Sequence, residues 1–266
     1  MSLTRWELLL SFCKKGCKSG LLAGVLWGLL FLFFTSPLIW EAEAYEETGN
    51  HHHIQETLHS RAHGEGRFDL IGNIKQQIVP TVLGCTLLGG AFGIIISLFL
   101  GLGFSFGFFT RNFFESPIRS ATLTGLISFL IFHGIPSVSN PPELPGVIGS
   151  EESFTSRQYW WIQSIVCSIM GVLIYLIISS KESGRIVKVF GLLLGIFIAL
   201  LPFLSGTGAE AVNSVVPPEL RSRFVYYSLT INFIFWLCLT IQFFLRLAKD
   251  KTIDSYQILN EEIVIQ

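Results

Sequence analysis

Six stretches of mostly apolar residues, each of about twenty residues or more, constrain the fold of this chain more than any other feature. A transmembrane helix needs about 20 such residues, because each residue rises 1.5 Å and the hydrocarbon core is about 30 Å thick. We therefore predict an all-α fold, a polytopic bundle of transmembrane helices. The expected spans cover about 20–40, 78–103, 118–136, 159–179, 187–205 and 224–245.

The composition also points to a membrane protein. Half of the 266 residues are hydrophobic and 14% are charged, whereas soluble domains carry about 25% charged residues. The chain has no phosphate-binding loop and no H-E-x-x-H, C-x-x-C or G-x-S-x-G motif, which argues against an enzyme. We expect no tightly bound cofactor. The net charge of −1 gives no reason to expect a nucleic-acid partner.

Basic residues predict the orientation, since cytoplasmic loops carry an excess of Lys and Arg. With the N-terminus in the cytoplasm, 12 of the 18 Lys and Arg residues lie on the cytoplasmic side and 6 lie outside. Both termini are then cytoplasmic, with segments 1–19 and 246–266 flanking a membrane domain at 20–245. Three loops face outward, at 41–77, 137–158 and 206–223.

Glycines recur at four-residue spacing inside the apolar stretches. Small residues at this spacing let helix backbones approach closely, so we interpret them as packing positions. The glycines concerned are Gly20, Gly24 and Gly28, then Gly89 and Gly93, then Gly191 and Gly195.

A weak internal repeat runs through the outer loops. The sequence Pro-Pro-Glu-Leu occurs at 141–144 and again at 217–220. In each outer loop an arginine then comes shortly before an aromatic residue at the start of the next span. This pattern predicts three successive helical hairpins, an arrangement of parallel repeats that occurs in transporters. Anchoring of aromatic residues at the membrane interface is the other explanation of the second feature.

The first outer loop holds most of the candidate chemistry. Five of the six histidines lie in it, among carboxylates. Neutral imidazole is the commonest metal ligand and suits Zn, Cu, Ni, Fe and Co. The tract lacks the fixed spacing of a rigid site, so we predict a weak collecting site for metal, with a solvated polar linker as the alternative. The residues are His51, His52, His53, His59 and His63, with Glu41, Glu43 and Glu46.

Three further candidates lie near the outer ends of other spans. His133 is inside a predicted span, where an ionisable group is a functional candidate by default. Its position near the interface also fits simple contact with water. Glu143 and Glu219 each follow Pro-Pro. Stiff proline pairs would hold these carboxylates over the mouth of the bundle, and ordinary surface turns are the alternative.

Several short motifs occur in a distinctive order around the apolar stretches. They are SPLIWEAEAYEE at 36–47, the histidine tract, PPELPG at 141–146, RQYWW at 157–161 and VPPEL at 216–220. Together they resemble the CbtA family of cobalt transporter subunits, over about 19–245. The family is usually described with five spans, so five is the alternative to the six counted here.

The resemblance implies a cobalt uptake permease of the bacterial inner membrane. It implies a metal role for the five loop histidines and a shared-motif role for Glu143 and Glu219. Expected partners are the lipid bilayer, a small single-span, histidine-bearing subunit resembling CbtB, and further copies of this chain in a homo-oligomer. From the ligands alone, nickel or zinc would bind as well as cobalt.

The leading hypothesis is therefore a membrane permease subunit for uptake of a divalent transition metal. The outward loop would capture the ion, which would pass Glu143 and Glu219 and enter between helices near His133. A non-transporting scaffold or metal-sensing subunit of a larger complex is the alternative.

Overall fold

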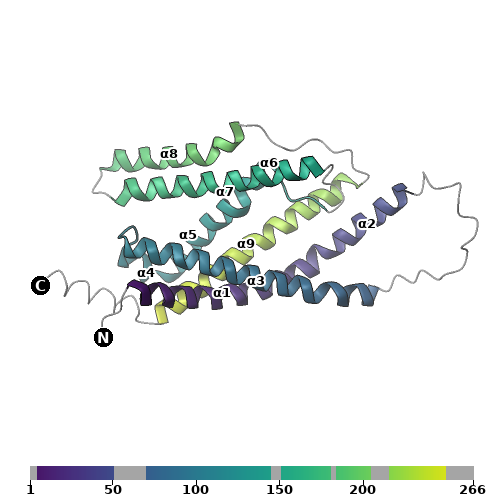
Figure 1. The fold of residues 1–266 in the computed structure, drawn as a ribbon, viewed down its shortest axis with the longest axis horizontal. Helices are drawn as coiled ribbons and strands as arrows, with labels where there is room; N and C mark the ends of the chain where they lie inside the picture. Colours follow the sequence, from purple (N-terminus) through teal and green to yellow (C-terminus); the bar gives the residue numbers. More distant parts are fainter. Residues whose placement is uncertain (1–4, 51–69, 145–150, 181–183, 205–215, 250–266) are drawn as a thin grey trace, which may run out of the picture.

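The computed structural model describes residues 5–50, 70–144, 151–180, 184–204 and 216–249, and all regular secondary structure in these ranges is helical (Figure 1). The helices are α1 (Arg5–Phe34), α2 (Ser36–Asn50), α3 (Leu70–Ser105), α4 (Arg111–Glu115), α5 (Pro117–Phe129), a π-helical turn η2 (Leu130–Gly134), α6 (Ile135–Ser139), α7 (Glu151–Ser180), α8 (Arg185–Leu204) and α9 (Pro218–Lys249).

The described chain contains six helical segments that are long and apolar enough to cross a membrane. This confirms the prediction of six spans rather than five. Helix α1 begins earlier than predicted, at Arg5, so it includes most of the segment assigned to the cytoplasm. The segments are Arg5–Tyr45, Ile78–Ser105, Pro117–Ser139, Phe154–Ser179, Arg185–Leu204 and Pro218–Lys249.

The first span is broken between α1 and α2. The Thr35 hydroxyl donates a hydrogen bond of 2.5 Å to the carbonyl oxygen of Phe31, and such bonding back along the chain bends helices. Pro37 follows in the first turn of α2, where a missing N–H is tolerated. The break directs α2 toward the start of α9, where Leu38 and Ala42 join one apolar cluster with Leu220, as Figure 1 shows for the two helices.

Helices α1 and α3 pack through the predicted glycines. An added Cβ at Gly20 would collide with the carbonyl oxygen of Gly89, and one at Gly16 would collide with that of Gly93. A Cβ at Gly24 would meet the carbonyl oxygen of Cys85 at 2.5 Å. The two backbones are therefore in direct contact over several turns, which confirms the packing interpretation of these positions.

The other long helices do not form the predicted consecutive hairpins. Helix α7 packs on α8, with Gly171 and Gly195 in backbone contact, and α5 packs on α9 beside Gly125. Only the first of the three expected pairs is therefore a closely packed hairpin. The physical reason is that small residues determine which helices pack closely together in lipid. Here they allow α7 to pack against α8. In Figure 1 this pair lies on one side of the remaining helices.

Aromatic side chains fill the space among α1, α3, α5 and α9. Near one end, Phe12, Phe114 and Phe243 make edge-to-face ring contacts. Farther along, Phe92 and Phe132 pack against Trp236. The start of α1 and the end of α9 lie at the first of these ends (Figure 1). The end of α2 and the starts of α7 and α9 lie at the opposite end, where the candidate site is found.

Candidate functional site

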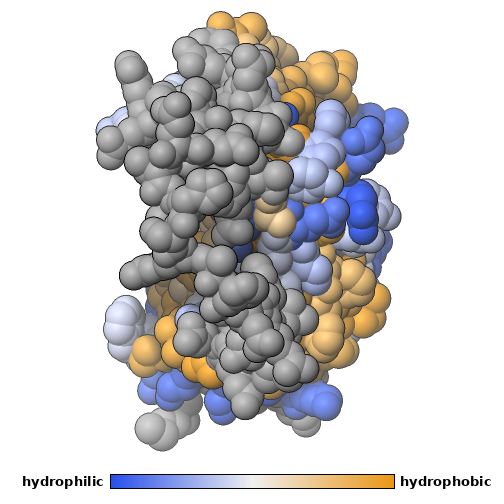
Figure 2. Space-filling view, turned by 90° about the vertical axis from the view of Figure 1, so that its right-hand side faces the viewer, coloured by the Kyte–Doolittle hydropathy of each residue, from blue (hydrophilic) through white to orange (hydrophobic). Residues whose placement is uncertain are grey.

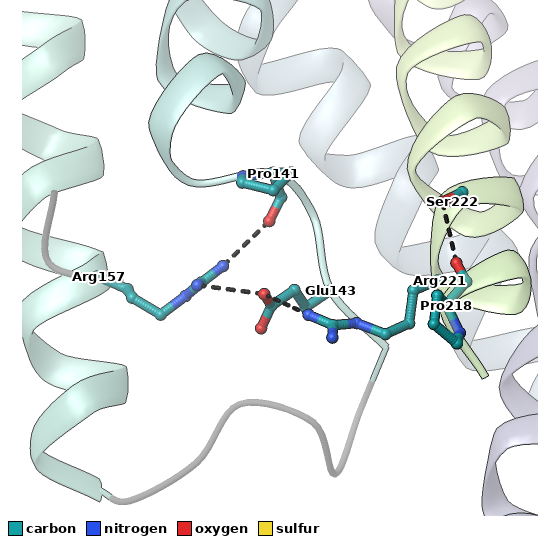
Figure 3. Close-up of polar contacts among 6 residues, drawn as sticks. All are labelled: Pro141, Glu143, Arg157, Pro218, Arg221 and Ser222. Atoms are coloured by element: carbon teal, nitrogen blue, oxygen red, sulfur yellow. Dashed lines mark hydrogen bonds and ion pairs between the residues drawn. The ribbon is translucent and has the colours of Figure 1, made fainter. Parts of the chain in front are cut away.

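Glu143 lies between two arginines that come from different helices. Its Oε1 atom is 3.5 Å from Nη1 of Arg157 on α7 and 3.3 Å from Nη2 of Arg221 on α9. Figure 3 shows the carboxylate between the two guanidinium groups. The segment that follows α6 thus connects α7 to α9 through one side chain.

The local sequence explains why Glu143 is held in this position. The prolines at 141 and 142 fix the backbone φ angle of two residues in succession. Arg157 Nη2 also donates a hydrogen bond of 3.0 Å to the carbonyl oxygen of Pro141 (Figure 3). Leu144 is fully buried and packs with Leu220 and its neighbours. The carboxylate is therefore anchored on both sides along the chain.

The charges of this cluster do not cancel, because one carboxylate faces two guanidinium groups. The side chains of Glu143 and Arg157 are each 14% exposed, and that of Arg221 is 35% exposed. Ion pairs shielded from water interact more strongly than those on a surface. The contact of Glu143 with Arg157 is therefore the stronger candidate for holding the helices together.

His133 belongs to the π-helical turn η2, and such turns are frequent at functional sites. The Nε1–H group of Trp236 donates a hydrogen bond of 3.1 Å to Nδ1 of His133. Indole nitrogen is a donor only, so Nδ1 must accept. In the neutral imidazole the proton then lies on Nε2. The ring is oriented further by Phe129, which stacks parallel to it at 6.4 Å.

A cavity of about 250 Å³ brings His133 and Glu143 together among α6, α7 and α9. Asn140 and Asn232 also line it. Both amide atoms of Asn140 and the Oδ1 atom of Asn232 are buried, with no hydrogen-bond partner among the described residues. Buried amides normally have partners, so two residues that line the cavity lack, in the part of the chain that the structure describes, hydrogen bonds that such groups usually make.

A second cavity of about 260 Å³ lies on the other side of Glu143, toward α9, with Arg221 and Ser222 in its lining. Figure 2 views this end of the molecule directly. Hydrophilic residues form a band across its described surface, with hydrophobic residues above and below the band.

The other acidic candidates lie apart from the cavities. Glu41 and Glu43 are exposed on α2, and Glu46 is on the same helix. Glu219 is exposed in the first turn of α9. Within the described ranges, no group of three or more His, Cys, Asp or Glu side chains could hold a metal ion. The loop histidines lie outside the described residues: His51, His52, His53, His59 and His63.

Comparison with known proteins identifies the family. A family model described as "Probable cobalt transporter subunit (CbtA)" matches residues 10–246, nearly the whole chain. The chain belongs to the CbtA family. No curated protein and no solved structure matches it. The family match confirms the resemblance seen in the motifs, and together with the six apolar helices it makes this CbtA chain a multi-pass membrane protein.

Sequence reasoning singled out Glu143 and His133 in this CbtA chain but missed several of the residues that surround them. Arg157 was noted only as part of a motif before an aromatic helix start, and Arg221 was not singled out. Asn140 gave no signal, because asparagine before Pro-Pro is typical of an ordinary turn. The useful signal was that each Pro-Pro-Glu motif is followed by arginines at the start of a helix.

The hydrogen bond from Trp236 to His133 should contribute measurably to the free energy of unfolding. Trp236→Phe removes the indole N–H and leaves Nδ1 without its donor, so we expect a loss of about 1 kcal/mol in the free energy of unfolding. Trp160→Phe is the matched control, because the buried Nε1 of Trp160 has no partner within the described part of the chain. Thermal unfolding in detergent compares the two variants, and equal shifts would refute the role of the hydrogen bond.

Proposed function

We propose that this CbtA family member is the membrane permease subunit through which a divalent transition-metal ion, cobalt, enters a bacterial cell across the inner membrane. The single observation that carries the proposal is a cavity, lined in part by charged and polar side chains, at one end of an otherwise apolar and aromatic bundle. A carboxylate, an imidazole, a guanidinium and three side-chain amides help to line that cavity. The family description supplies cobalt, since the same ligands would bind nickel or zinc at least as well.

The histidine-rich loop is the proposed capture site. Helix α2 ends at Asn50 and α3 begins at Leu70, so His51–His63 belong to the connection between them. Figure 1 places the end of α2 at the same end of the bundle as the start of α9, where Glu143 lies between its arginines. Loop imidazoles together with Glu41, Glu43 and Glu46 would raise the local concentration of cations near the cavity.

The proposed orientation places this end outside the cell and both termini in the cytoplasm. The start of α1 and the end of α9 lie at the opposite end of the bundle (Figure 1). A divalent ion moving inward gains about 2.3 kcal/mol per charge per 100 mV of inside-negative potential. Two charges give about 4.6 kcal/mol, which drives accumulation without ATP. A small single-span, histidine-bearing subunit resembling CbtB would assist delivery.

Replacement of the five loop histidines by glutamine tests the capture site. We expect uptake of cobalt by cells to fall by about tenfold at low external metal and to recover at high metal, because the loop concentrates the ion rather than forming the path. Glutamine keeps the polarity and size of the side chain while removing the imidazole. Unchanged uptake at low metal would exclude the loop from the mechanism.

A further inference from the structure

We infer that Arg157 stands in for the transported cation beside Glu143, so that the cavity holds a positive charge of its own when no metal is bound. This inference rests on the proposed function. It adds a metal-binding site at which Arg157 competes with the ion for Glu143. The site would bind a divalent transition-metal ion through the carboxylate of Glu143 and the amide oxygens of Asn140 and Asn232.

The ligand set is present, but its one ionisable member is held by donors from the bundle, since both arginines approach Oε1 of Glu143. The amide oxygens of Asn140 and Asn232 have no partner among the residues that the structure describes. Asn140 is 8% exposed, so these polar atoms are shielded from bulk water. The cavity thus combines two unused oxygen ligands with one carboxylate that the arginines already contact.

For electrostatic reasons, a metal ion can bind beside Glu143 only if an arginine leaves. With both arginines in place, a divalent ion next to Glu143 would meet a net positive charge in a region sheltered from water, which is strongly unfavourable. Arg157 shares the cavity with the two asparagines, whereas Arg221 reaches Glu143 from the second cavity. Departure of Arg157 alone would therefore remove the positive charge from the cavity that the asparagines line, while Arg221 stays.

The exchange also affects the helices. Arg157 joins α7 to the segment after α6 through two contacts, to Glu143 and to the carbonyl oxygen of Pro141. Helix α7 is packed closely on α8 through Gly171 and Gly195. Displacement of Arg157 by the ion would therefore loosen α7 and α8 together from α6 and α9, and entry of the metal would be linked to movement of this pair.

The test measures binding of cobalt chloride by calorimetry to the full chain in detergent, with the five loop histidines replaced by glutamine so that the loop does not contribute. In this background Arg157→Gln should tighten cobalt binding by about tenfold. A positive charge within 4–6 Å weakens the affinity of a carboxylate for another cation by about tenfold or more. Arg157→Lys keeps the charge and should bind as the parent does. Glu143 retains its contact with Arg221 in both variants, so the carboxylate keeps one positively charged partner.

Arg111→Gln is the matched control for loss of a positive charge. Arg111 forms an ion pair with Glu115 on the surface of α4, away from the cavities, and its loss should leave cobalt binding unchanged. Weaker or equal binding by Arg157→Gln would overturn the inference, as would the absence of cobalt binding from all variants. Transport of cobalt by the unmodified chain in either case would leave the proposed function in place, so the two failures are distinguishable.

Discussion

Gly20→Leu is expected to prevent assembly of the bundle. A side chain at this position collides with the carbonyl oxygen of Gly89, which is backbone and cannot rotate away. The two helices would have to separate along their glycine contacts, including Gly16 with Gly93. Overpacking in a well-packed core costs about 1–3 kcal/mol, and a collision with rigid backbone should cost about 3 kcal/mol or more.

Gly84→Leu provides the control on the same pair of helices. Gly84 is also a glycine of α3, but an added Cβ there meets no atom within 4 Å. We expect this variant to elute as a single monodisperse species in detergent and to unfold at the parent temperature. The Gly20→Leu chain should aggregate or unfold at a much lower temperature. Equal thermal stability of the two variants would mean that α1 and α3 do not pack as described.

The second large effect is expected for Glu143→Gln. The change removes the only carboxylate that both arginines contact in the described structure, and it leaves Arg157 without a compensating charge in a cavity where it is 14% exposed. Loss of one partner of a shielded ion pair costs about 3 kcal/mol. Because the cavity also loses its anionic ligand, we expect cobalt uptake to fall by at least about tenfold.

Glu115→Gln is the control for Glu143→Gln. Glu115 pairs with Arg111 one turn away on the same short helix, and its side chain is 56% exposed. Surface pairs of this kind contribute less than about 1 kcal/mol, so both stability and uptake should stay at the parent level. Parent-level uptake by Glu143→Gln would exclude Glu143 from the path of the ion.

The spans could be predicted from the sequence because the thickness of the bilayer sets their length. The predicted third span at about 118–136 corresponds to a described segment at Pro117–Ser139. The pairing of helices could not be predicted in the same way. Lipid surrounds all six spans alike, so hydropathy does not choose a partner. The backbone contact between Gly171 and Gly195 pairs α7 with α8, and Gly171 was not among the glycines singled out.

The candidate site was predictable only in part, for a related reason. A carboxylate after Pro-Pro and a histidine inside a span are unusual enough to be noticed in a sequence. Their partners are distant along the chain: Arg221 is 78 residues from Glu143, and Trp236 is 103 residues from His133. These contacts depend on how α9 packs against α5 and η2, which local sequence patterns do not reveal.

Cobalt flux into liposomes is the most direct test of the proposed permease. The purified chain is reconstituted alone, and entry of cobalt is followed with a dye trapped inside while an inside-negative potential is imposed with potassium and valinomycin. A permease should admit cobalt faster than empty liposomes do, faster still as the potential becomes more negative, and Glu143→Gln should abolish the difference. Flux equal to that of empty liposomes at every potential would contradict transport by this chain and favour a scaffold or sensor.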